Sequence, residues 1–318
     1  MADQFDRLDE LIDAVLSRPS PALLTDAELA PLVGLAAELR DLPSHGFKQR
    51  LREDLQRRAS MTPTSVNPIR KGFHTLTPYL ISHQGTALID FITRAFGAVE
   101  TLRVPGSAGG FHSEFRIGDS MIMLGGAPTI EPSPVALHFY VPDVDQAYRR
   151  AVEAGGTSLY PPTDHEYGER GAAVRDLSGN GWYLATHRGP KYVPEGLRDV
   201  TIYLHPVGAP KMIDFLQRAF AAELLERHDA EGRVAHAKLR IGDSIIEMSE
   251  PHGLAQPSEA TLHMYVPDTD ALYRRALEAG ATSLAEPADQ PYGDRRAGVR
   301  DPFGNRWYIA TQIREAQP

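Results

Sequence analysis

An internal repeat of about 125 residues limits the fold of this chain more than any other feature of its sequence. The segment from Tyr292 to Thr311, YGDRRAGVRDPFGNRWYIAT, matches an earlier one from Tyr167 to Thr186, YGERGAAVRDLSGNGWYLAT. Three more pairs share nearly the same offset: LHFYVPDVDQAYRRAVEAG with LHMYVPDTDALYRRALEAG, HSEFRIGDSMIM with HAKLRIGDSIIE, and ALIDFITRAFGA with KMIDFLQRAFAA. Solenoid repeats are only about 20–50 residues long, so this length indicates a duplicated domain.

Composition excludes several classes of protein. The net charge of -9 disfavours a general nucleic-acid binder, because such a surface repels phosphate. The chain has no cysteine, which excludes disulfides, thiolate metal sites and cysteine nucleophiles. The first residues carry acids where a signal peptide has Lys or Arg, and no run of 18 apolar residues occurs, so we expect a cytoplasmic protein without membrane contact. Nucleotide-binding, zincin and hydrolase motifs are also absent from the sequence.

The first 60 residues differ in character from the repeats. Apolar residues at helical spacing predict amphipathic helices at 4–17 and 25–39, with a third after Ser44. Residues 61–69 are interpreted as a linker. The helical segment 1–60 is expected to pack on the main body or mediate dimerisation, and a regulatory or partner-binding role is the alternative.

Each repeat divides again into two similar modules. From Gly72, a strand and a helix are followed by two strands that meet at a tight turn, Gly118-Asp119, and the same order restarts near Val135. The pattern β-α-β-β therefore occurs four times. We predict one domain at 70–190 and a second at 196–314.

The combination of PYL, IDF, RAFGA, RIGDS, YVPDVD, RAVEAG and D-x-x-GN-x-W-Y-x-AT resembles the vicinal oxygen chelate superfamily, in its PhnB-like and glyoxalase/bleomycin-resistance-like branch. This resemblance implies an α+β fold with tandem βαβββ modules, four in all, forming two cupped sheets. The chain would be a pseudo-dimer by itself, and a homodimer stays open. Family members include metal-dependent lyases, isomerases and dioxygenases, as well as metal-free proteins that bind small molecules.

The resemblance also implies positions for metal ligands. These fall on Thr77, Met123, Ala136 and Tyr183 in the first repeat, and on Thr201, Glu247, Thr261 and Tyr308 in the second. Of these eight residues only Glu247 is a good ligand, whereas a stable catalytic site needs about three. No metal cofactor is therefore expected, although a divalent ion is not excluded.

An alternative metal site lies off the family pattern. Strand alternation places His236, Lys238 and Glu247 on the polar, cavity-facing side, with His263 on an equivalent face. His236, Glu247 and His263 are thus the candidates for metal ligands or catalytic groups in the second cup, as His112, Glu114 and His138 are in the first. Two histidines and one glutamate match the composition of a facial triad. An ion pair of Lys238 with Glu247, and hydrogen-bonded interior histidines, explain the same residues without a metal.

Two further sets of residues complete the candidate site. Arg170 and Arg295 lie on predicted loops, where each could grip an anionic ligand or pin its loop to Asp176 or Asp301; the second role is favoured. Tyr183 and Tyr308 face the cavity, while Trp182 and Trp307 point toward the helices. The expected ligand cavity comprises His112, Glu114, Met123, His138, Tyr183, His236, Lys238, Glu247, His263 and Tyr308.

Three functions remain compatible with the sequence. The leading hypothesis is a protein that binds or sequesters a small organic molecule. The second is a divalent-metal-dependent lyase, isomerase or dioxygenase, and the third is a ligand sensor that acts through the helical N-terminus.

Overall fold

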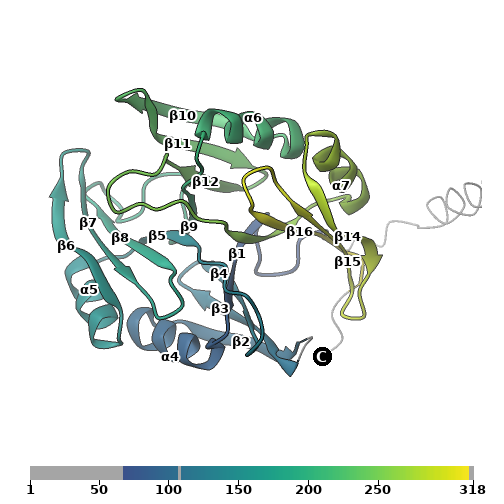
Figure 1. The fold of residues 1–318 in the computed structure, drawn as a ribbon. Helices are drawn as coiled ribbons and strands as arrows, with labels where there is room; N and C mark the ends of the chain where they lie inside the picture. The colour runs from purple at the N-terminus through teal and green to yellow at the C-terminus, as the bar shows by residue number, and fades with distance from the viewer. Residues whose placement is uncertain (1–66, 107–108, 315–318) are drawn as a thin grey trace, which may run out of the picture. The chain divides into compact units, whose positions relative to one another are not determined.

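The computed structural model describes residues 67–106 and 109–314, so the predicted helices of residues 1–60 lie outside the described residues. The described part contains four modules in chain order (Figure 1). The first comprises β1 (Leu76–Ser82), α4 (Gly85–Phe96), β2 (Val99–Pro105), β3 (Phe111–Ile117) and β4 (Ser120–Gly126). The second comprises β5 (Ala136–Tyr140), α5 (Val144–Glu153), β6 (Thr157–His165), β7 (Glu169–Arg175) and β8 (Gly181–His187).

The second repeat supplies the other two modules. The third comprises β9 (Val200–Leu204), α6 (Ala209–Phe220), β10 (Glu223–Ala230), β11 (Arg233–Ile241) and β12 (Ser244–Met248). The fourth comprises β13 (Thr261–Tyr265), α7 (Thr269–Glu278), β14 (Thr282–Asp289), β15 (Asp294–Arg300) and β16 (Arg306–Gln312). The α+β class and the four βαβββ modules predicted from the sequence are confirmed.

The modules pair across the two repeats to form two eight-stranded sheets. The first sheet has the order β14-β15-β16-β13-β1-β4-β3-β2, and the second has the order β10-β11-β12-β9-β5-β8-β7-β6. Antiparallel pairing of β1 with β13 joins modules one and four, and pairing of β5 with β9 joins modules two and three. The expectation of one cup per repeat is therefore wrong, because every sheet contains one module from each repeat.

The helices hold each repeat together instead. α4 lies beside α5, and α6 lies beside α7 (Figure 1). Phe96, at the end of α4, packs on Trp182 of the next module with ring centroids 4.5 Å apart, and Phe220 packs on Trp307 in the same way at 4.7 Å. Both tryptophans are fully buried among the core residues, as the alternation of their strands predicted.

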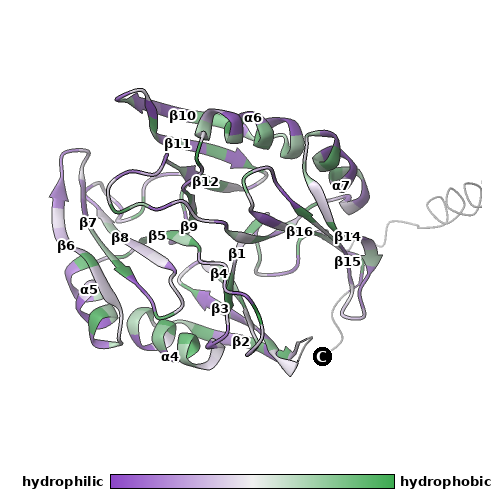
Figure 2. Cartoon of the chain, viewed as in Figure 1, coloured by the Kyte–Doolittle hydropathy of each residue, from purple (hydrophilic) through white to green (hydrophobic). Residues whose placement is uncertain are grey.

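The burial of each element explains how clearly its hydrophobic pattern shows in the sequence. Every helix mixes hydrophobic and hydrophilic residues, as Figure 2 shows, because one face of each is buried. β2 and β6 were not predicted as strands. They form one edge of their sheets and are largely exposed, so they carry little of the hydrophobic alternation that identifies a strand.

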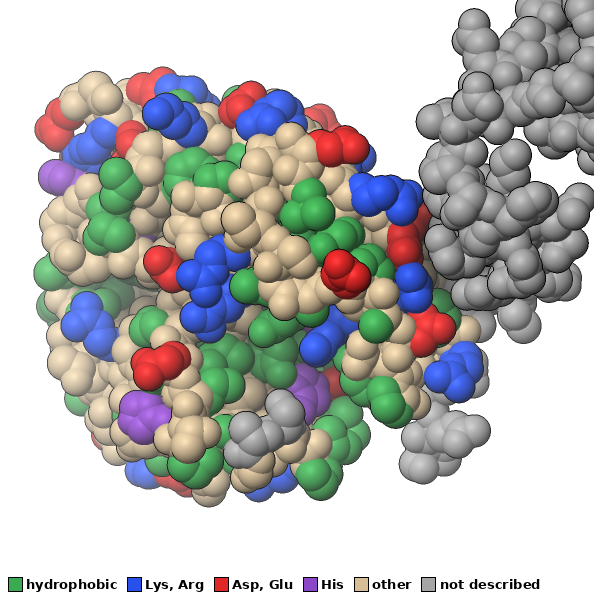
Figure 3. All heavy atoms as spheres, turned by 45° about the vertical axis from the view of Figure 1, so that its right-hand side comes forward, with side chains coloured by type: hydrophobic (Ala, Val, Ile, Leu, Met, Phe, Trp, Pro, Cys, Tyr) green, Lys and Arg blue, Asp and Glu red, His purple; other side chains and the backbone are tan. Residues whose placement is uncertain are grey.

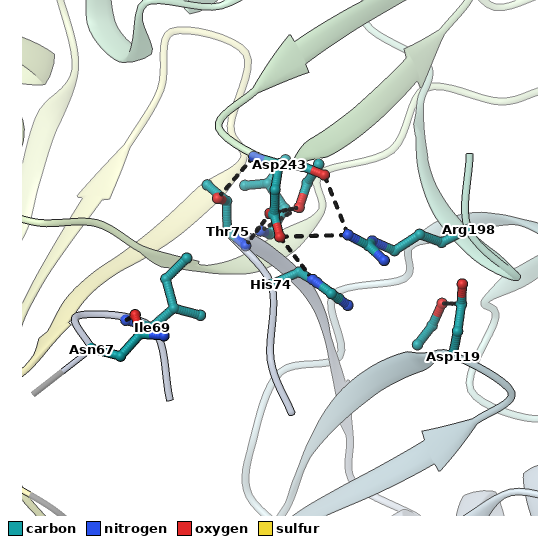
Figure 4. A network of polar contacts seen from close by, with 10 residues as sticks. Asn67, Ile69, His74, Thr75, Asp119, Arg198 and Asp243 are labelled. Atoms are coloured by element: carbon teal, nitrogen blue, oxygen red, sulfur yellow. Dashed lines mark hydrogen bonds and ion pairs between the residues drawn. The ribbon is translucent and has the colours of Figure 1, made fainter. Parts of the chain in front are cut away.

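Two equivalent turns connect the repeats. In the turn between β11 and β12, Asp243 accepts a hydrogen bond from the Thr75 amide at 2.8 Å, and the Ser244 hydroxyl accepts one from the Leu76 amide at 3.0 Å. His74 and Arg198 also contact Asp243, at 2.8 and 3.4 Å (Figure 4). The turn between β3 and β4 does the same for the start of β9. There Asp119 accepts a hydrogen bond from the Asp199 amide and Ser120 accepts one from the Val200 amide, both at 3.0 Å. The repeated sequence IGDS is thus a clamp that begins the first strand of the partner repeat.

We expect Gly242→Ala to lower the free energy of unfolding by disturbing this clamp. Gly242 has a φ of +59°, and a Cβ atom there would lie 2.2 Å from the Thr75 side-chain oxygen. Gly232, in the β10–β11 turn, has a φ of +75° but open space around it. Positive φ alone costs about 1 kcal/mol for alanine, so Gly232→Ala should lose that much and Gly242→Ala about 2–3 kcal/mol in urea unfolding. Equal losses in the two variants would show that the contact with Thr75 contributes nothing.

Candidate functional site

The side of each sheet that faces away from the helices carries most of the polar residues. We call this side of the second sheet the Glu247 cup; it carries His138, Tyr183, Tyr203, His236, Lys238 and Glu247. We call the same side of the first sheet the Arg296 cup; it carries His112, Glu114, Met123, His263, Arg296 and Tyr308. Alternation along the strands places these residues on one face and the core residues on the other.

Glu247 is the centre of the first of these cups. Its side chain is 1% exposed, and its two oxygens lie 2.8 Å from His138 Nδ1 and 3.3 Å from His236 Nε2. Burial by itself would raise the pKa of Glu247, but the two histidines outweigh it and hold the pKa well below its usual range. Burial likewise lowers the pKa of His138, and Glu247 more than offsets this, so that the pKa is raised. The pair is therefore ionic at least between about pH 4.3 and 6.5, the ordinary pKa values of the two side chains.

Further charges surround this pair. Glu169 lies 3.9 Å from His138 Nε2 and accepts a hydrogen bond from the Tyr140 hydroxyl. Lys238 is opposite Glu247 in register, as predicted, but its ammonium lies 3.2 Å from Glu226 on the edge strand β10. Three carboxylates thus share the cup with one lysine and the imidazoles, which gives the Glu247 cup an acidic bias.

Aromatic rings form the neighbouring part of the Glu247 cup. The ring of Tyr203 lies 5.8 Å from that of Tyr183 and 4.9 Å from that of His205. His205 is buried, which lowers its pKa to about 4, and its Nε2 has no hydrogen-bond partner among the described residues. This wall offers flat apolar surface beside an unused polar atom.

The Arg296 cup is built differently. Arg70, which precedes β1, forms an ion pair with Glu114, and His112 lies 3.2 Å from the same carboxylate. The Tyr79 hydroxyl lies 3.0 Å from His112 Nδ1, and the Tyr79 ring lies 5.9 Å from that of Tyr308. The charge of Glu114 is therefore already compensated by neighbours in the protein.

The structure separates the residues proposed as one metal site. His263 is on β13 in the first sheet, whereas His236 and Glu247 are in the second, where His138 joins them instead. Similarly, His112 and Glu114 face His263 rather than His138. The ten residues of the predicted cavity lie on the cup faces, five in each, but in groups that cross the repeats; whether a ligand contacts them stays a prediction.

Arg170 and Arg295 have structural partners other than those expected. Arg170 binds Asp145 at 2.6 Å and Asp164 at 3.0 Å, and Arg295 binds the equivalent residues Asp270 and Asp289. The expected partner Asp176 instead accepts the Trp182 indole N–H at 2.9 Å. Both guanidinium groups therefore pin a hairpin to the start of a helix, and neither is free to grip an anion.

Sequence reasoning missed several polar residues of the two cups, namely Arg70, Glu169, Tyr203, His205 and Arg296. Glu169 and Arg296 lie in the repeated segment, and the difference between its two copies is a signal that identifies Arg296. Gly171 of the first repeat corresponds to Arg296 of the second, a change from no side chain to a cation.

The donor atoms do not fit the metal site of the family. Among the described residues no group of three His, Asp or Glu is arranged to hold a metal ion. At the positions that the family uses, Glu247 is the only carboxylate, and imidazoles already occupy both of its oxygens. Whether the protein binds a metal ion stays a prediction.

The described residues contain no helix long and apolar enough to cross a membrane.

Comparison with known proteins agrees with this architecture. The crystal structure of glyoxalase I from Zea mays has a similar fold, with a TM-score of 0.58 at 15% identity over 74% of this chain and 92% of its own. The model of the Glyoxalase/Bleomycin resistance protein/Dioxygenase superfamily matches residues 74–184 and 208–309. The chain belongs to this superfamily.

Three curated relatives extend this comparison. An uncharacterized Mycobacterium tuberculosis protein is 37% identical over 119 residues, which is 34% of this chain and 70% of the relative. CFP32 of the same species, provisionally named a glyoxylase, is 26% identical over 74% of this chain and 95% of its own length. The anthracycline biosynthesis protein DnrV of Streptomyces peucetius is 29% identical over 59% of this chain and 68% of its own.

Proposed function

We propose that this protein binds a small planar organic molecule in the Glu247 cup, through a cationic or hydrogen-bond-donating group and without a resident metal ion. The observation that supports this most directly is the pairing of buried Glu247 with His138 and His236. Two imidazoles keep the carboxylate ionised there, in the place where the family pattern has a metal ion.

The surroundings of Glu247 favour a planar cation as the ligand. Glu169 and Glu226 add negative charge, while Tyr183 and Tyr203 offer aromatic faces for stacking or cation–π contact. The name of the relative DnrV, an anthracycline biosynthesis protein, is compatible with a polycyclic ligand. The face shown in Figure 3 mixes cationic and anionic side chains and so carries no patch of a single charge.

Isothermal titration calorimetry with two naphthalene probes tests the proposal. We expect 2-naphthylmethylammonium to bind more tightly than neutral 2-naphthamide, and Glu247→Gln to weaken it about tenfold because the full negative charge is lost. Glu226→Gln, a change at a more exposed carboxylate, should have a smaller effect. If both variants bind the ammonium probe like the wild type, the Glu247 cup does not recognise cations.

Elemental analysis of the wild type and the same two variants tests whether the protein holds a resident metal ion. A chain purified without chelators or an affinity tag should contain no stoichiometric divalent ion, even after incubation with Zn²⁺, Ni²⁺, Mn²⁺ or Fe²⁺. About one ion per chain that Glu247→Gln removes and Glu226→Gln retains would instead favour a metal-dependent lyase or dioxygenase. The sensor hypothesis has its own test, since deleting residues 1–66 should then abolish a protein interaction and leave ligand binding intact.

A further inference from the structure

His263 in the Arg296 cup has an unused polar atom. The residue is 5% exposed, and its Nδ1 has no hydrogen-bond partner among the residues that the structure describes. Burial, with Arg296 and Arg70 nearby, lowers the pKa of His263 to about 3, so the ring is neutral. A buried polar atom without a partner costs free energy, and such atoms in native proteins call for an explanation.

Comparison with the Glu247 cup shows what His263 lacks. His138 occupies the same position in the first repeat, and its Nδ1 binds the Glu247 carboxylate at 2.8 Å. The residue that corresponds to Glu247 is Met123, which is buried on β4 of the same sheet as His263. The Arg296 cup therefore keeps the histidine and replaces its carboxylate partner by an apolar side chain.

The same cup has gained a cation. Arg296 replaces Gly171, and its guanidinium lies over the Tyr308 ring, 5.0 Å from the centroid. It forms no ion pair with a carboxylate among residues 67–106 and 109–314, in contrast to its neighbour Arg295. Tyr308 is paired in register with His263, and its strand β16 also pairs with β15, which carries Arg296. Arg296 is close enough to His263 to lower the pKa of the imidazole. Arg296 is half-buried and acts electrostatically on Tyr292 and Asp294, but no described carboxylate lies within ion-pair distance of its guanidinium.

We propose that the Arg296 cup binds an aromatic carboxylate, whose carboxylate lies between His263 and Arg296 and takes the role that Glu247 has in the other cup. The anion would give His263 Nδ1 its missing partner and Arg296 its missing counter-ion. Tyr79, Tyr308 and Met123 provide apolar surface for the aromatic ring. This site is distinct from the Glu247 cup and does not depend on the function proposed there.

Calorimetry with 2-naphthoate and 2-naphthamide tests the site. We expect the carboxylate to bind at least about tenfold more tightly than the amide, and Arg296→Gln to remove this preference. Arg300→Gln, on the same strand and similarly half-buried, is the matched control and should bind like the wild type. No saturable binding of 2-naphthoate, no preference over the amide, or equal losses in the two variants would each overturn the proposal.

Two further measurements locate the anion. Addition of 2-naphthoate should shift the ¹⁵N resonances of the His263 imidazole, and Met123→Glu should abolish binding by supplying a carboxylate from the protein. Because Met123 is buried, thermal unfolding is used to check that Met123→Glu folds. If this variant does not fold, the result for Arg296→Gln tests the proposal alone. Glu247→Gln should leave 2-naphthoate binding unchanged. If Glu247→Gln weakens the binding of 2-naphthoate and Arg296→Gln does not, the anion binds in the Glu247 cup and the inference is wrong. This outcome does not depend on the result with the ammonium probe.

Discussion

Replacing Glu247 by alanine is expected to lower the free energy of unfolding by about 3–5 kcal/mol near pH 6, because the change leaves a buried imidazolium without its partner. Glu247 is almost fully buried and binds both His138 and His236, while Glu169 and Lys238 face the same cluster. Urea unfolding measures the effect. Glu226→Ala removes a carboxylate that is 39% exposed at the rim of the same cup and should cost less than about 1 kcal/mol.

The loss should depend on pH in a defined direction. Glu247 has a lowered pKa in the folded protein, so its contribution is present above its unfolded pKa of about 4.3 and is lost as pH falls toward the folded value. His138 has a raised pKa, so its contribution is complete below its unfolded pKa of about 6.5 and is lost as pH rises through the folded value. The difference between wild type and Glu247→Ala should therefore be largest between about pH 4.3 and 6.5 and smaller at pH 9. A difference that does not change with pH would contradict the ionic pair.

The second large effect is expected at Asp176. Its two oxygens accept hydrogen bonds from the Trp182 indole, the Asn180 side chain and the backbone amides of Ser178 and Asn180, all at 2.9–3.0 Å. Asn180 in turn accepts from the Val135 amide at 3.0 Å, which connects the β7–β8 turn to the start of β5. Asp176→Ala leaves several buried donors unpaired and should cost about 3–4 kcal/mol.

The equivalent residue Asp301 provides a replicate within the same chain. It binds Trp307 and Asn305 with the same geometry, so Asp301→Ala should lose a similar amount in urea unfolding. Asp143→Ala removes a helix cap that accepts one hydrogen bond, from the Gln146 amide, and should cost only about 1 kcal/mol. Losses at Asp176 and Asp301 no larger than that at Asp143 would show that the repeated D-x-x-GN-x-W motif has no special role in stability.

The sequence predicted the faces of the strands better than their partners. Alternation is a local property, so Trp182 was correctly assigned to the core, and the register of Lys238 with Glu247 followed from one short turn. Pairing between distant strands has no local signal. The association of His138 with Glu247, which are 109 residues apart, depends on β5 joining β9 across the repeats.

Charge partners were harder to predict for a related reason. Arg170 was expected to bind Asp176, yet it binds Asp145 and Asp164, because the fold brings the start of α5 and the end of β6 to its guanidinium. Arg70, the first residue of the predicted first domain, contacts Glu114 from a segment that precedes β1 and had no predicted role. Such contacts are set by how elements pack, which residue types and their spacing do not specify.

The exchange of modules between the sheets has a consequence for how the two cups could diverge. If two identical chains of one repeat each formed the same pair of sheets, symmetry would make both binding sites identical, and every substitution would appear in both. Once the two copies are joined in one gene product, a single change such as Gly171 to Arg296, or Met123 to Glu247, alters one site and spares the other. Each repeat contributes half of both cups, so fusion allows the residues of one cup to change without those of the other, with no increase in the number of modules.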